Sequence, residues 1–181
     1  MTIISKLKNK IIYFLYFITV FLFSIYSYSL VDLNLTLFNH KLWDSFRSFI
    51  IQIGYFNRGL STTIFFAGII ILYVLYFLVK KTKSNPIKVA FVIGIVSLVA
   101  YPFLSHDFFN YMFDAKILTF YGKNPYLFKA LDFPADHWTR FMHWTHRVYP
   151  YGPTFLPITL IPSFLSGGKF IFSLFLFKFT F

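Results

Sequence analysis

The run IIYFLYFITVFLFSIYSYSLV, residues 11–31, decides the fold class because its 21 positions hold no charged residue. A helix rises about 1.5 Å per residue, so roughly 20 apolar residues cross the hydrocarbon of a bilayer. Two further runs are nearly free of charge, LSTTIFFAGIIILYVLYFLV at 60–79 and IKVAFVIGIVSLVAYPFL at 87–104, the latter with Lys88 near its start. The sequence therefore predicts an all-α, multi-span integral membrane protein with three transmembrane helices in residues 1–104.

The overall composition supports a membrane protein. The chain is 57 % apolar, with 28 Phe, 13 Tyr, no Glu and no Cys, which does not fit a soluble domain of this size. The absence of Cys excludes disulfides and thiolate metal sites. A net charge of +11 could indicate nucleic-acid binding, but the lysines lie at the ends of the apolar runs, so no nucleic acid is expected as a partner.

Lysines mark one side of the predicted membrane. They precede the first run and fill the short connection between the second and third, at Lys6, Lys8, Lys10, Lys80, Lys81, Lys83 and Lys88. The positive-inside rule places both segments in the cytoplasm. Residues 32–59 and 105–153 are then extracytoplasmic, in a multi-pass protein of the cell membrane. The first run also resembles a signal peptide, although it is longer than the usual 7–15-residue apolar core.

Two shorter apolar segments flank the predicted spans. Residues near 38–53 carry apolar side chains at helical spacing, which predicts an interfacial helix that either guides a lipid substrate or serves as a packing element. Residues 154–181 predict a short embedded helix, which holds Pro157 and Pro162, and then the start of an incomplete transmembrane helix. The last 12 residues reach only about 18 Å. We therefore expect the N-terminal portion of a longer protein, or the product of an interrupted reading frame.

Polar chemistry is concentrated in residues 105–153, which hold four of the six acids, four of the five histidines and two of the three tryptophans. In a hydrophobic protein such residues gather at the working face, which predicts an extracytoplasmic loop of the catalytic type. A helix should begin near Asp107 and end before Gly122, which suits a C-terminal cap. Asp107, Tyr111 and Asp114 would share one face of it.

Asp107 is the strongest catalytic candidate, because a carboxylate just outside a span can act as a general base toward a membrane-bound substrate. The alternative is an acid that only stabilises a helix N-terminus. Asp114 on the same face would repel Asp107 unless a cationic or hydroxyl group lies between them. Arg147 is the better of the two loop arginines for binding a phosphate, although it could also be an interfacial arginine.

His143 and His146 have the i, i+3 spacing of some metal ligands, but no third ligand is fixed by local spacing. The sequence therefore assigns no metal ligand, and we expect an interfacial cluster here. Trp138 and Trp144 could stack on a sugar ring, although tryptophans are also common at membrane boundaries.

The order of these elements is more informative than any one of them. It consists of Ser105-His106-Asp107 after a span, Tyr111, Asp114, Tyr121-Gly122-Lys123-Asn124-Pro125-Tyr126, and Tyr151-Gly152-Pro153 before an apolar helix. Over residues 87–165 this pattern resembles the membrane glycosyltransferases of the GT-C superfamily, above all bacterial polyprenol-phosphate-dependent mannosyltransferases. Since that family usually has eight or more spans, the chain would be an apparently truncated GT-C-like fold.

The resemblance implies that Asp107 is the catalytic aspartate of an inverting glycosyltransferase. The donor would be a sugar, mannose among the candidates, on a polyprenyl phosphate, and the acceptor an extracytoplasmic glycan or lipid. The expected substrate-binding residues are Tyr111, Asp114, Asn124, Tyr126, Arg147 and Tyr151. No cofactor is certain; some proteins of this architecture use a divalent metal, and the sequence does not decide this.

Two other functions are compatible with the sequence. In a transporter fragment, ionisable residues should lie inside the spans and near broken helices, whereas here they lie outside. In a non-catalytic membrane subunit or remnant, the loop would only pack against partners.

Overall fold

The computed structural model describes residues 3–181, with the backbone alone for residues 3–6. Residues 1 and 2, which belong to the predicted segment 1–104, lie outside the described residues. The described chain is built of helices and turns, without a strand. It forms two compact units: the first runs up to Val31 and includes Asn39–Tyr101, and the second combines Asp32–Phe38 with Pro102–Phe181.

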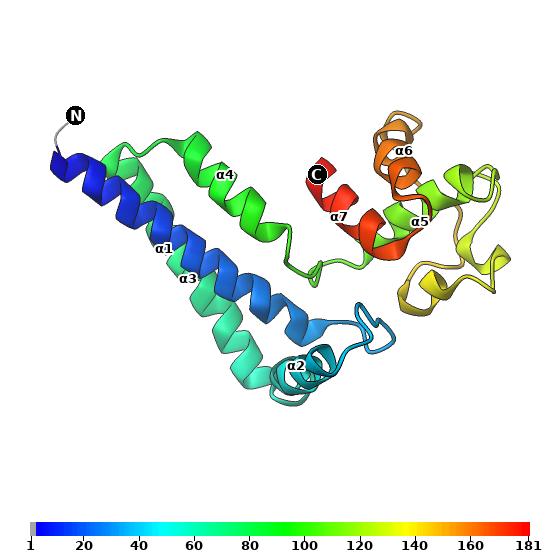
Figure 1. Ribbon diagram of the computed structural model, residues 1–181, viewed down its shortest axis with the longest axis horizontal. Coiled ribbons are helices and arrows are strands. Elements are labelled where there is room, and N and C mark those ends of the chain that lie inside the picture. The colour runs from blue at the N-terminus through cyan, green and yellow to red at the C-terminus, as the bar shows by residue number, and fades with distance from the viewer. Residues whose placement is uncertain (1–2) are drawn as a thin grey trace. The chain divides into compact units, whose positions relative to one another are not determined.

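The first unit is built around α1 (Ile3–Ser27), which lies along α3 (Arg58–Thr82) and α4 (Pro86–Ser97) (Figure 1). Three buried α1 residues at four-residue spacing line the same face of the helix, as helix geometry requires. They form a core with side chains of α3 and α4, consisting of Ile12, Tyr16, Val20, Leu75, Val89 and Val96.

Within residues 3–181, two helices are long and apolar enough to cross a membrane, Leu7–Leu30 and Arg58–Thr82. Only 11 % of the most apolar window of the second is buried, and large side chains such as Phe66, Ile70 and Phe77 are exposed. An exposed apolar surface of this size is typical of a membrane or protein interaction site. This agrees with the first two predicted spans.

The third predicted span is shorter than expected, because α4 ends at Ser97 and residues 98–106 form turns and extended chain. Pro102 disfavours helical backbone in the residue before it. The Tyr101 N–H donates to the Ser27 hydroxyl at 2.7 Å, and the Val99 carbonyl accepts from the Tyr28 hydroxyl at 2.7 Å. These contacts with the end of α1 replace the helical hydrogen bonds that the apolar pattern alone predicted.

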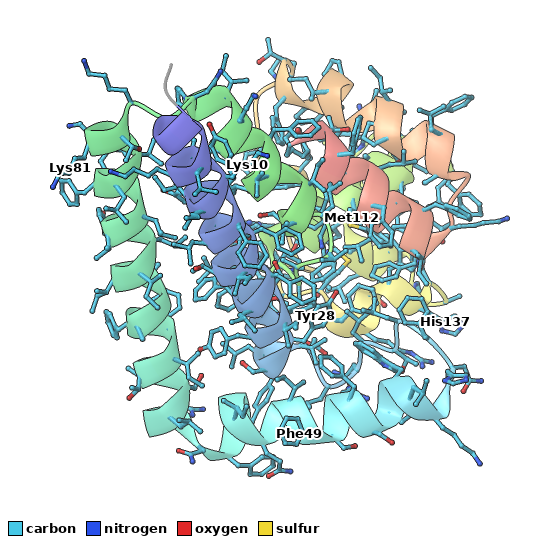
Figure 2. All side chains as sticks on the ribbon, turned by 60° about the vertical axis from the view of Figure 1, so that its left-hand side comes forward. Lys10, Tyr28, Phe49, Lys81, Met112 and His137 are labelled. Carbon is cyan, nitrogen blue, oxygen red and sulfur yellow. The ribbon has the colours of Figure 1, made fainter. Side chains whose placement is uncertain are left out.

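The helix predicted near residues 38–53 is present as α2 (Lys41–Ile51), which continues as a π-helix at Gln52–Phe56. Figure 2 shows Phe49 of α2 at the end of the unit opposite to Lys10 and Lys81. A Cβ on Gly54 would lie 2.0 Å from the Ser29 carbonyl oxygen. Only glycine therefore allows the π-helix after α2 to lie this close to Ser29, just beyond the end of α1.

The second unit is built around α5 (Asp107–Thr119), which packs against α6 (Phe155–Ser166); α6 in turn packs against α7 (Phe170–Thr180) (Figure 1). These bounds confirm the helices predicted after residues 107, 154 and 170. Beyond the end of α5, Gly122 has φ +63° and donates its N–H to the Leu118 carbonyl at 3.1 Å, which confirms the predicted glycine cap.

The chain between α5 and α6 is irregular, as predicted. Its regular elements are two short 3-10 helices, Ala130–Asp132 and His137–Phe141. The segment is nevertheless packed, because Ala130, Trp138 and Phe141 are buried.

Candidate functional site

The N-terminus of α5 positions Asp107. The Ser105 hydroxyl accepts the Asp107 N–H at 3.2 Å, so the residue that precedes the helix satisfies one of its open donors. The Asp107 side chain keeps 34 % of its surface exposed, so a ligand in solvent can reach it.

Arg147 comes from the loop between α5 and α6 and faces Asp107, with 3.9 Å between Nη2 and Oδ1. Its guanidinium also lies over the Trp144 ring, 4.6 Å from the ring centroid. The Asn110 side chain on α5 donates to the Trp144 carbonyl at 3.2 Å, which ties this part of the loop to the helix. The structure thus brings together the acid and the arginine that the sequence singled out.

Asp114 lies on the same helix but is buried. Burial raises the pKa of its carboxyl to about 7, and the Arg147 charge opposes the shift. Arg147 therefore pairs with Asp107 and also acts on the charge of Asp114. A carboxyl with a pKa near neutrality can donate or accept a proton under physiological conditions.

Tyrosines cover the next part of this face. The Tyr111 and Tyr151 rings pack edge to face at 5.1 Å, and the Tyr151 hydroxyl donates to that of Tyr111 at 3.3 Å. The Tyr126 hydroxyl donates to the Tyr151 carbonyl at 3.2 Å. Tyr149 is buried, and within residues 3–181 its hydroxyl has no hydrogen-bond partner. Burial, followed by Tyr126 and Asp114, raises the pKa of Tyr149 to about 12.

Asn124 is placed differently from the other predicted binding residues. Its side chain is exposed, and Oδ1 accepts the Tyr126 N–H at 2.9 Å. This hydrogen bond closes an Asx turn before the loop. The geometry gives Asn124 a role in positioning Tyr126.

A buried ion pair was missed by the sequence analysis. Lys116 of α5 binds Asp136, which also accepts from the Tyr121 hydroxyl at 2.6 Å and from the Trp138 N–H at 3.0 Å. Burial alone would raise the pKa of Asp136, but these hydrogen bonds outweigh it and lower the pKa. Lys116 also lies 3.9 Å from the Trp138 ring centroid. The only signal for this ion pair in the sequence was that Lys116 stands next to apolar residues in the second half of the predicted helix.

One group of histidine and carboxylate side chains among the described residues has the spacing to hold a metal ion, namely Asp32, His106 and His143. The two imidazole rings stack at 3.9 Å. Burial and then His143 lower the pKa of His106, against the charges of Asp32 and Asp107. His146, the partner that the spacing indicated for His143, has its ring near Trp144 instead.

Comparison with known protein families identifies the family of this chain. Residues 36–181 match the family model described as alpha-(1->6)-mannopyranosyltransferase, N-terminal domain. Searches of curated proteins and of solved structures gave no match. The matched residues include all of α5, the loop with Arg147, and α6. The mannosyltransferase resemblance noted in the sequence is thereby confirmed, and the chain belongs to the family of alpha-(1->6)-mannopyranosyltransferase N-terminal domains.

Proposed function

We propose that the protein transfers mannose from a polyprenyl phosphate to an extracytoplasmic glycan or lipid. The observation that carries this proposal is the partly exposed Asp107–Arg147 pair, found in a chain of a mannosyltransferase family. Members of such a family need a sugar donor and an acceptor. A base beside a phosphate-binding cation is what transfer from a sugar phosphate requires.

In the proposed reaction, Asp107 accepts the proton of the acceptor hydroxyl while that oxygen attacks the anomeric carbon. The bond between the anomeric carbon and the phosphate oxygen breaks, and the polyprenyl phosphate leaves with the electron pair. A single displacement from the opposite face inverts the configuration. Arg147 neutralises the departing phosphate through a bidentate hydrogen bond.

The ion pair would reorganise when the donor binds. At 3.9 Å, Arg147 and Asp107 are only loosely paired, and a phosphate group offers the guanidinium closer and more numerous acceptors. Movement of Arg147 toward the phosphate would free the Asp107 carboxylate to act as a base. Asp114, whose pKa is about 7, would hold a proton and orient the acceptor.

The remaining expected binding residues would shape the sugar site. Tyr111 and Tyr151 present adjoining rings and hydroxyls, a combination that can pack against a sugar and bind its hydroxyl groups. Tyr126 and Asn124 would support them through the hydrogen bonds that fix the turn.

The proposed location is a membrane crossed several times, with the lysine-rich ends of the first-unit helices in the cytoplasm and residues 105–153 outside. The two long apolar helices support the membrane location, and the lysines at Lys10 and Lys81 support the orientation (Figure 2). A lipid-linked donor would then reach the site from the bilayer.

The donor class can be tested in membranes of cells that produce the protein. We expect radiolabelled mannose to enter product from polyprenyl-phosphate mannose. Labelled nucleotide-linked mannose should give no product once synthesis of the lipid-linked sugar is blocked. Undiminished transfer from the nucleotide sugar under that block would contradict the proposed donor.

A further inference from the structure

We propose that Asp32, His106 and His143 form a binding site for a divalent transition-metal ion, of which Zn²⁺ fits best. Each residue offers one ligand atom, and the three atoms all lie within 4.8 Å of one another. Ligand atoms around a tetrahedral Zn²⁺ are about 3.4 Å apart, given bonds of roughly 2.0–2.2 Å. Small side-chain rotations therefore suffice to close the site around an ion.

The three ligands come from three separate segments of the second unit. Asp32 begins the segment Asp32–Phe38, His106 directly precedes α5, and His143 follows the 3-10 helix His137–Phe141. Two polar residues on one helix can come close together by chance through helical spacing alone. Three ligands from segments that are distant in the sequence cannot. A bound ion would link Asp32–Phe38 to α5 and to the loop.

Neighbouring groups hold the ligands in place. The Asn34 N–H donates to Asp32 Oδ1 at 2.8 Å, and the Leu35 N–H donates to the Asp32 carbonyl at 3.0 Å. The His106 and His143 rings are nearly parallel, with 17° between their planes. Hydrogen bonds such as the one that Asp32 accepts orient metal ligands in known sites.

The ligand types select the class of metal. Two imidazoles and one carboxylate suit Zn²⁺ and related transition metals, whereas Mg²⁺ and Ca²⁺ prefer sites made of oxygen atoms. Three protein ligands leave a fourth position open in a tetrahedral site. Because His143 is exposed, water or an anionic oxygen can occupy that position.

None of the three metal ligands is assigned a role in the proposed mannosyl transfer, although His106 directly precedes Asp107. Asp32 lies outside residues 36–181, the part of the chain that matches the family model. The metal site can therefore be tested by binding alone, without an assay of sugar transfer.

The test uses the full chain, purified in detergent through a tag that contains no histidine and stripped with a chelator. Isothermal titration with Zn²⁺ should give one ion per chain, and Mg²⁺ should give no comparable binding. Co²⁺ should produce the visible absorption of a tetrahedral complex. Removal of a group that supports a metal ligand typically lowers the metal affinity about 10- to 100-fold. Removal of a ligand itself should lower the affinity more.

The variants His106→Ala, His143→Ala and Asp32→Asn should therefore bind Zn²⁺ at least about 10-fold more weakly and lose the Co²⁺ spectrum. The matched controls His146→Ala and Asp132→Asn should bind like the unchanged chain. His143 is exposed, so its variant carries the test even where His106→Ala misfolds. A stripped chain that binds no Zn²⁺, or equal binding by His143→Ala and His146→Ala, would overturn the proposal.

Discussion

Arg147 Nη2 lies 3.9 Å from Asp107 Oδ1, and both side chains are about one-third exposed, at 37 % and 34 %. Exposed ion pairs of this kind contribute only about 0–1 kcal/mol to stability. The pair can therefore be broken by an incoming anion at little cost to the fold. This property makes it suited to a binding site and poorly suited to a structural role.

Replacement of Arg147 by lysine keeps the charge but removes the planar fork that binds phosphate through two hydrogen bonds. A charge-assisted hydrogen bond contributes about 1.5–3 kcal/mol, so kcat/KM for the lipid-linked donor should fall roughly 10- to 150-fold, mainly through KM. The matched control is Arg140→Lys, an exposed arginine of the same loop. Equal kinetics for the Arg147 and Arg140 variants would exclude Arg147 from donor binding.

Asp114 should make the stability of the protein depend on pH. Its pKa is about 7 in the folded chain and about 3.9 when unfolded. Because folding raises this pKa, the protein is most stable with respect to Asp114 below about pH 4. It loses stability as the pH rises from about 4 to about 7. Asp114→Asn, which stays neutral, should remove this loss.

Thermal unfolding followed by circular dichroism between pH 4 and pH 8 measures the effect. The difference in melting temperature between Asp114→Asn and the unchanged chain should grow with pH in favour of the variant. Asp132→Asn, an exposed acid of the same loop, should keep the original pH dependence. A constant difference across the range would show that Asp114 is ionised throughout.

Breaking the buried Lys116–Asp136 pair should strongly destabilise the second unit. Both side chains are almost fully buried, and removal of one member of such a pair typically costs about 3–5 kcal/mol. Asp136→Ala should therefore lower the melting temperature strongly, and Asp132→Ala much less. The double variant Lys116→Met with Asp136→Leu should recover most of the loss, because it leaves no buried charge without a partner.

The same pair predicts sensitivity to acid. The folded pKa of Asp136 is lowered, so its contribution is complete above the unfolded pKa of about 3.9 and is lost as the pH falls through the folded value. Acid unfolding of the Asp136→Leu, Lys116→Met variant should consequently occur at lower pH than that of the unchanged chain. An unchanged acid midpoint would rule out this contribution.

The sequence predicted features that depend on local signals. The start of α5 near Asp107 and its cap at Gly122 follow from helix-terminus chemistry, and the first two long helices follow from apolar length. The predicted length of α4 was wrong, because contacts of Tyr101 and Val99 with the end of α1 decide where α4 ends. Such contacts between distant residues leave no periodic pattern in the sequence.

The candidate site likewise combines features that local sequence signals predicted with features that depend on distant contacts. Asp107, Tyr111 and Asp114 could be placed on one face from helical spacing alone. The Asp136 partner of Lys116 and the proximity of Asp32 to His106 could not, because they depend on how the loop and the segment Asp32–Phe38 fold back onto α5. The i, i+3 spacing of His143 and His146 likewise gave no indication that His143 lies close to His106.

The orientation in the membrane can be measured because the chain contains no cysteine. Single cysteines at the exposed positions Lys81 and Lys123 should react differently with a membrane-impermeant thiol reagent in intact cells. We expect labelling of Lys123→Cys, and labelling of Lys81→Cys only after the cells are opened. The reverse pattern would place residues 105–153 in the cytoplasm.

The central claim is that Asp107 is the base of a mannosyl transfer from polyprenyl phosphate. The most direct measurement compares the rate of transfer by the unchanged protein, Asp107→Asn and Asp132→Asn, with labelled polyprenyl-phosphate mannose and acceptor in proteoliposomes. Acid–base catalysis typically contributes 10²–10⁴-fold, so Asp107→Asn should lower kcat by about that factor while donor KM changes little and Asp132→Asn stays fully active. Full activity of Asp107→Asn would contradict the claim.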